Sequence, residues 1–234
     1  FVLISFTISQ DFALNHPEWT GVRHWGAGIV TSLLFFTCVF LHEMGHSLVA
    51  RGFGIPVMSI TLFIFGGVAH IKREPSKPMQ EFLIAIAGPL TSIALALFFY
   101  GGMWLFSLGA SPGQAAPSMP ASICFWLGSI NLLLAIFNMV PGFPLDGGRV
   151  LRSIVWAATG RFDKATRIAA AIGTMIAYGL IALGIFLAIG MKLVLNGIWM
   201  AFIGMFLWFA AYRSVAHLSA RQILSGLRVG DVMD

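Results

Sequence analysis

The chain has 234 residues, of which 58% are hydrophobic and 10% are charged. A soluble domain carries about 25% charged residues, so this composition excludes an ordinary water-soluble protein. The formal net charge of +5 is that of a chain with basic membrane-flanking loops and does not indicate nucleic-acid binding. The composition therefore predicts a polytopic protein embedded in a lipid bilayer.

The apolar segments predict an all-α polytopic membrane protein with about six transmembrane helices. Residues 1–8 look like the end of a first membrane segment, and residues 11–25 form a polar connection. A helix needs about 20 apolar residues to cross a bilayer. Five further segments approach or exceed that length: residues 26–50, 79–105, 121–140, 168–189 and 194–212.

One segment differs from the spans. Residues 55–71 are rich in β-branched and aromatic residues, contain Gly66 and Gly67, and are too few for a spanning helix. Extended backbone at membrane depth is tolerated only where protein buries it or where it lines a cavity. We therefore expect a short membrane-embedded β element between the second and third helices. Two breaks are also expected, at Gly88-Pro89 within a span and over residues 141–149.

The span at residues 26–50 carries the pattern His-Glu-x-x-His at His42, Glu43 and His46. On a helix the two histidines are one turn apart on one face, where both imidazoles can bind one zinc ion. A carboxylate at Glu43 is placed to take a proton from a metal-activated water. The structural alternative is three polar residues that hydrogen-bond one another inside a helix bundle. Ionisable groups at membrane depth favour a functional site.

Asp146 is the predicted third ligand. It lies near the end of its segment in a stretch rich in proline and glycine, a composition typical of non-helical backbone that aims a side chain into a cavity. Two histidines and one carboxylate with an open position form a catalytic rather than a structural zinc shell. The alternative is a turn aspartate that hydrogen-bonds its own backbone.

The basic residues predict the orientation. Alternating the spans places twelve of the fourteen Lys and Arg on one side, which the positive-inside rule makes cytoplasmic. His46 then lies about 7 Å and His42 about 14 Å from that boundary. A cell-membrane protein with its site toward the cytoplasm and a cytoplasmic C-terminus is expected. The twelve are Arg51, Lys72, Arg73, Lys77, Arg149, Arg152, Arg161, Lys164, Arg167, Arg213, Arg221 and Arg228.

Together these motifs resemble the site-2 protease family of intramembrane metalloproteases. The resemblance rests on His42 to His46, on the Asn-Met-Val-Pro-Gly-Phe-Pro-Leu-Asp-Gly-Gly stretch from Asn138 to Gly148, and on Ala-Gly-Pro-Leu beginning at Ala87. It implies one zinc ion per chain and hydrolysis of peptide bonds in or near transmembrane segments of membrane proteins. Regulated substrates such as an anti-sigma factor or a transcription-factor precursor are the expectation from the family.

The C-terminal stretch from Leu227 to Met233 resembles the opening of a CBS domain. The expected organisation is a transmembrane metalloprotease core over residues 1–217. Residues 218–234 would form a cytoplasmic linker and the start of a truncated CBS domain. Family members with a CBS pair are thought to sense nucleotides through it, so a nucleotide is a further expected partner. Both chain ends look cut.

Several other polar and small residues could have either a functional or a purely structural role. Asn131 and Asn138 are candidates for transition-state contacts, or for interhelical hydrogen bonds. Gly66 and Gly67 resemble the family's β element and would clamp an unwound substrate by strand addition, or would only pack. Relatives often carry Asn after the Gly-Pro pair, where this chain has Thr91 and Ser92, whose hydroxyls would take over its hydrogen bonds.

Three other functions are alternatives to the protease. A catalytically silent zinc-binding regulator would bind transmembrane helices without cutting them, although an intact Glu43 argues against it. A prenyl-protein type of zinc protease would need a second glutamate at membrane depth, and the sequence predicts none there. A zinc transporter would need acidic or histidine residues along a path through both leaflets.

Overall fold

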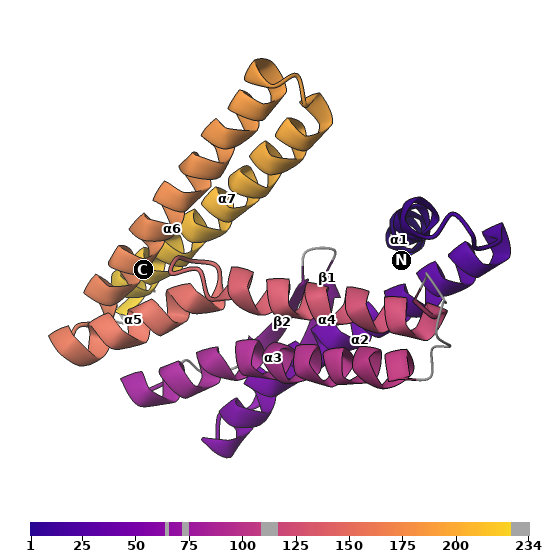
Figure 1. The fold of residues 1–234 in the computed structure, drawn as a ribbon. Coiled ribbons are helices and arrows are strands. Elements are labelled where there is room, and N and C mark those ends of the chain that lie inside the picture. The colour runs from indigo at the N-terminus through magenta and orange to yellow at the C-terminus, as the bar shows by residue number, and fades with distance from the viewer. Residues whose placement is uncertain (64–65, 72–74, 109–116, 226–234) are drawn as a thin grey trace, which may run out of the picture. The chain divides into compact units, whose positions relative to one another are not determined.

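The computed structural model describes residues 1–63, 66–71, 75–108 and 117–225 (Figure 1). Side chains are described for these residues except within 60–74 and 217–225. The chain divides into two compact units, which are described separately. The first comprises Phe1–Glu74 and Ala87–Phe137, and the second comprises Pro75–Ile86 and Asn138–Asp234. The CBS-like stretch after residue 225 lies outside the described residues, so the division at residue 217 stays a prediction.

The first unit holds the predicted spans of the N-terminal half. Its elements are α1 (Val2–Asn15), α2 (Gly21–Gly52), the strands β1 (Val57–Phe63) and β2 (Gly66–Ile71), α3 (Pro78–Leu108) from Ala87 onward, and α4 (Met119–Asn138) up to Phe137. The core of this unit forms where α1 and α2 pack with α3 and α4, through Phe12, Ala27, Phe99 and Leu127.

The second unit begins with the first turns of α3 and continues with α5 (Asp146–Thr159), α6 (Phe162–Ile185), a π-helical turn (Phe186–Gly190) and α7 (Val194–Ser225). Helices α6 and α7 lie side by side (Figure 1). Small residues permit this close packing. A Cβ at Gly184 would lie 2.6 Å from the backbone of Ala201.

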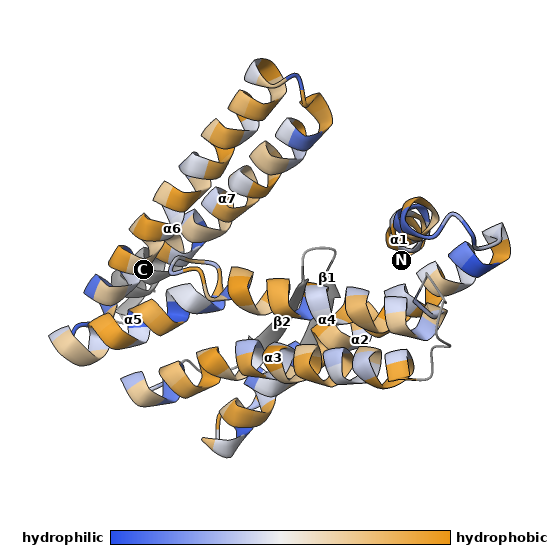
Figure 2. Ribbon diagram, viewed as in Figure 1, coloured by the Kyte–Doolittle hydropathy of each residue, from blue (hydrophilic) through white to orange (hydrophobic). Residues whose placement is uncertain are grey.

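Five of the described helices are long and apolar enough to cross a membrane, which confirms the predicted all-α polytopic class (Figure 2). They are α2, α3, α4, α6 with the turn that follows it, and α7 as far as Ala216. Helix α1 has 14 residues and is shorter than the span length of about 20. It occupies the place of the first, incomplete predicted segment.

The predicted hairpin is present between α2 and α3. Strands β1 and β2 pair antiparallel, with Leu62 opposite Gly67 and Phe63 opposite Gly66. The β-branched and aromatic content that set this segment apart from the spans is typical of strands.

Several predicted helix ends and breaks differ from the structure. Helix α1 extends to Asn15, so the connection to α2 is shorter than predicted. Helix α3 continues through Pro89, because a long apolar helix tolerates one missing donor where unravelling would leave more backbone groups unsatisfied. Helix α5 already begins at Asp146 within the predicted break, and α7 runs beyond residue 212 to Ser225. Helix ends are therefore predicted less accurately from local composition than helix interiors.

Candidate metal site

The two histidines of the His-Glu-x-x-His pattern converge in the first unit. His42 and His46 lie on one face of α2 and are 3% and 4% exposed. Their Nε2 atoms are 3.3 Å apart and their rings are nearly perpendicular. Two ligands at about 2.0–2.1 Å from zinc in a tetrahedral shell lie about 3.3–3.4 Å from each other. The separation of the two nitrogens therefore fits two sites of one zinc shell.

A buried serine orients the first imidazole. His42 Nδ1 lies 2.9 Å from the Oγ of Ser92 on α3, and Ser92 is fully buried. In the tautomer that donates Nδ1–H to Ser92, the Nε2 lone pair is left for a metal. Histidine ligands usually donate their other ring N–H in this way, which fixes the ring and raises its basicity. Ser92 thus makes a hydrogen bond of the kind expected if its hydroxyl takes over from the asparagine of relatives. The Thr91 hydroxyl instead donates to the Ala87 carbonyl.

Glycines let α3 approach the histidine face of α2. A Cβ at Gly88 would lie 2.7 Å from His42 Nε2 and closer still to His46 Nε2. A Cβ at Gly45, inside the histidine pattern, would collide with the Thr91 hydroxyl and lie 3.1 Å from the Ala87 carbonyl oxygen. The Gly-Pro pair therefore does not interrupt α3. Its glycine leaves room beside the Nε2 atoms of the two histidines.

Glu43 follows His42 directly on α2 and its side chain is half-buried. At this position its carboxylate belongs to the same helical turn as the two histidines. The first unit thus supplies two imidazoles that could hold a metal ion and a neighbouring carboxylate of the type that serves as a general base.

Asp146 belongs to the second unit, where it is the first residue of α5 and is half-buried. The turn before it is closely packed. The Phe143 N–H donates to the Ala169 carbonyl on α6, at 3.3 Å. A Cβ at Gly142 would lie 2.6 Å from Gly173, and one at Gly147 would collide with the Met139 carbonyl. The Pro-Gly pattern therefore forms a compact turn that begins a helix with a carboxylate in its first turn, where the helix dipole favours negative charge.

The other predicted site residues lie on α4 and β2. Asn131 is buried on α4; its amide donates to the Leu127 carbonyl one turn earlier, and its side chain also hydrogen-bonds Cys38 of α2. Asn138 ends α4 and is half-buried. Gly66 and Gly67 begin β2.

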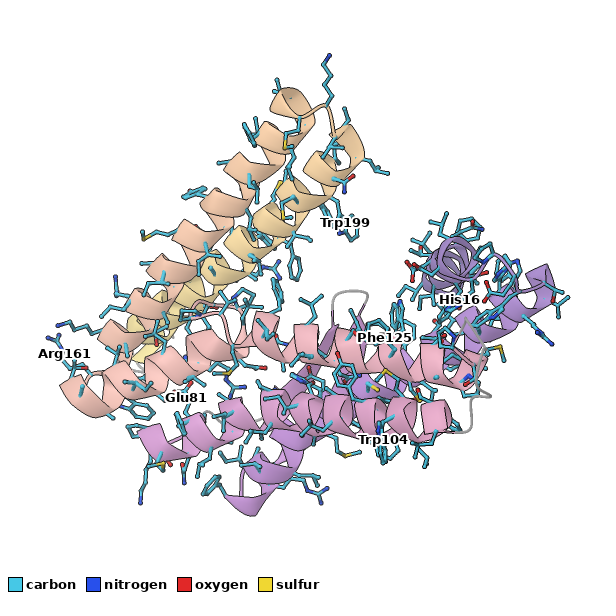
Figure 3. The ribbon with its side chains drawn as sticks, viewed as in Figure 1. His16, Glu81, Trp104, Phe125, Arg161 and Trp199 are labelled. Atoms are coloured by element: carbon cyan, nitrogen blue, oxygen red, sulfur yellow. The ribbon has the colours of Figure 1, made fainter. Side chains whose placement is uncertain are left out.

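One acidic residue inside a predicted span has a contact that the sequence did not indicate. Glu81, in the first turn of α3, is fully buried and pairs with Arg152 of α5, both in the second unit (Figure 3). Arg152, which was predicted only as one of the basic residues of the cytoplasmic side, therefore binds a buried carboxylate. An acidic residue at the edge of an apolar run was the available indication. Because Glu81 is paired with arginine, it does not restore the prenyl-protein alternative.

Comparisons with known proteins agree with these features. Residues 30–115 and 105–180 match Peptidase family M50. Among curated proteins named as zinc metalloproteases, Rip3 of Mycobacterium tuberculosis is 39% identical over 92% of this chain and 53% of its own length. The protein sll0528 of Synechocystis is 39% identical over 99% of this chain and 58% of its own length. The chain thus spans about half the length of these relatives.

Among solved structures, the fold is similar to the site-2 protease from Methanocaldococcus jannaschii. The TM-score is 0.58 and the sequence identity is 28%. The match covers 91% of this chain and 87% of that one.

Proposed function

Because the chain belongs to peptidase family M50, we propose that it is an intramembrane zinc endopeptidase that cuts peptide bonds in or near transmembrane segments. The observation that carries the proposal is the buried Nε2 pair of His42 and His46, spaced as two ligands of one tetrahedral zinc. The candidate membrane helices support membrane proteins as the proposed substrates.

The proposed zinc ligands are His42, His46 and Asp146, one ion per chain. They offer two imidazole nitrogens and a carboxylate oxygen, a donor set able to hold a metal ion. Such a shell leaves a position open for chemistry. Bound zinc would supply Lewis-acid polarisation of the scissile carbonyl and lower the pKa of water. Support for Asp146 comes from its place in the turn that resembles the family's Asn-Pro-Asp-Gly signature.

Glu43 is the proposed general base and acid. Its carboxylate takes a proton from the attacking water, and the protonated carboxyl then gives that proton to the leaving amide nitrogen. Asn138 and Asn131 are proposed as donors to the oxyanion. Asn131 already donates to the Leu127 carbonyl and hydrogen-bonds Cys38, so in this role one amide hydrogen would leave its present partner.

The proposal also covers the orientation in the membrane, the substrates and regulation by a nucleotide. The site faces the cytoplasmic side of a cell membrane and the C-terminus is cytoplasmic, supported by the side on which twelve of fourteen Lys and Arg fall. The substrates are regulatory membrane proteins of the anti-sigma or transcription-factor type, and a CBS pair following residue 217 would let a nucleotide regulate cleavage. Labelling of the variants Arg51→Cys and Lys192→Cys with an impermeant thiol reagent tests which side of the membrane each position faces. Labelling of Arg51→Cys from the outside would contradict the proposed orientation.

An Asp146→Ala variant is expected to lose most bound zinc and all measurable cleavage, since one of three ligands is gone. Zinc per chain is measured by metal analysis in detergent, beside cleavage of a generic transmembrane substrate. Asp163→Ala, an exposed acid in the first turn of α6, is the matched control and keeps both. Full zinc content in Asp146→Ala would contradict the ligand assignment. Zinc binding without cleavage in the unmodified chain would favour the silent regulator.

We also expect the β hairpin to hold the substrate as an added strand. Successive amides in a strand point to opposite edges, so of Gly66→Pro and Gly67→Pro one removes a donor facing β1 and the other a donor on the outer edge. The outer-edge variant is expected to raise KM and to leave zinc content unchanged, because only the strand added by substrate is lost. If neither variant alters cleavage kinetics, the strand-addition proposal is wrong.

A further inference from the structure

A buried ion pair lies beside the turn that leads into Asp146, within the second unit. Arg152 on α5 donates from Nε to Glu81 Oε1 at 2.7 Å, and its Nη2 donates to the same oxygen. The Glu81 side chain is completely buried and that of Arg152 is 11% exposed. The pair therefore joins the first turn of α3 to the middle of α5.

The guanidinium of Arg152 also lies between two aromatic rings. Its carbon Cζ is 4.9 Å from the ring centroid of Phe143 and 4.6 Å from that of Phe162. Both distances are within cation–π range. Phe143 is buried, belongs to the turn and stands three residues before Asp146. One side chain thus contacts the turn, the start of α6 and the start of α3.

This arrangement is not explained well by stability alone. The second carboxylate oxygen of Glu81 is buried without a hydrogen-bond partner among the described residues, so Arg152 is the partner that balances its charge. Desolvation of such a pair offsets much of its attraction, and apolar residues of similar volume often stabilise a fold as well. What a planar arginine offers beyond apolar packing is fixed geometry toward both a carboxylate and aromatic faces.

We propose that Glu81 and Arg152 are positioning residues for Asp146. Glu81 fixes the guanidinium, the guanidinium fixes Phe143, and the turn thereby presents the Asp146 carboxylate in the orientation that a metal requires. The inference rests on the proposed function, because it takes Asp146 to be a zinc ligand. It adds two residues that do not touch metal or substrate but set how well the ligand is placed.

The test compares zinc affinity with thermal stability in the 234-residue chain in detergent. The variants are Glu81→Gln, Arg152→Met and the double variant, which leaves no buried charge unpaired. The dissociation constant for zinc, from chelator competition well below the Tm, is expected to rise about 10- to 100-fold in all three. The double variant is expected to regain Tm lost by Arg152→Met but not zinc affinity. Arg167→Met, an exposed arginine on α6, keeps both values.

A double variant with unchanged zinc affinity would overturn the inference, whatever its Tm, because the pair would then be structural only. Should a single variant fail to fold, the neutral double variant decides. Asp146→Ala, measured in parallel, distinguishes failure of the positioning role from failure of the proposed ligand set. Loss of zinc there with normal affinity in the double variant refutes the positioning role alone. Unchanged zinc in Asp146→Ala refutes the proposed ligand set, and the positioning role with it.

Discussion

A Glu43→Gln variant is expected to keep its zinc and to cleave a transmembrane substrate about 10²- to 10⁴-fold more slowly, the range for loss of a general acid–base residue. Glutamine has nearly the same shape as glutamate but cannot take the proton of the attacking water. His42 and His46 are separate side chains on the same helix, so these two proposed ligands are unchanged. Zinc per chain and the single-turnover cleavage rate are the two measurements.

The control for Glu43→Gln is a glutamate that takes no part in the proposed reaction. Glu18 is a partly exposed residue in the connection between α1 and α2, where it pairs with His16. Glu18→Gln is therefore expected to cleave at the unmodified rate. If Glu43→Gln also cleaves normally, Glu43 is not the base. If it loses zinc instead, the carboxylate serves the metal site itself, and the division of roles between Glu43 and the histidines is wrong.

The histidine half of the site was predictable because its geometry is local. Residues four apart on a helix share a face, so the spacing of His42 and His46 alone predicts the convergence that the 3.3 Å separation shows. The spans were predictable for a similar reason, since a long apolar run has few alternatives to a membrane helix. Helix ends were less predictable, as the continuation of α1 to Asn15 shows.

Contacts between distant segments were not predictable from one sequence. Glu81 and Arg152 are 71 positions apart, and no spacing rule relates them. Each also had a local explanation, because charges beside an apolar run usually mark the membrane boundary. The role of Gly88 was hidden for another reason. A Gly-Pro pair ordinarily indicates a break in a helix, whereas here the glycine admits two imidazoles beside an uninterrupted helix.

That role of Gly88 leads to the second large effect. A Gly88→Ala variant is expected to bind almost no zinc and to show no measurable cleavage. The added methyl would occupy the space of the His46 imidazole, lying 2.5 Å from Cε1, and would sit 2.7 Å from His42 Nε2. Both rings would have to rotate away from the positions in which their nitrogens converge. Metal analysis and chelator competition measure the loss directly.

Helix propensity cannot account for such a loss. Alanine is a better helix former than glycine by about 1 kcal/mol, so the substitution by itself favours α3. Gly101→Ala provides the matched control on the same helix, because a Cβ there meets nothing within 4 Å. It is expected to keep full zinc and activity. Normal zinc affinity in Gly88→Ala would mean that the two imidazoles do not hold the metal at the nitrogens that face Gly88, and the proposed His42 and His46 ligation would have to be abandoned.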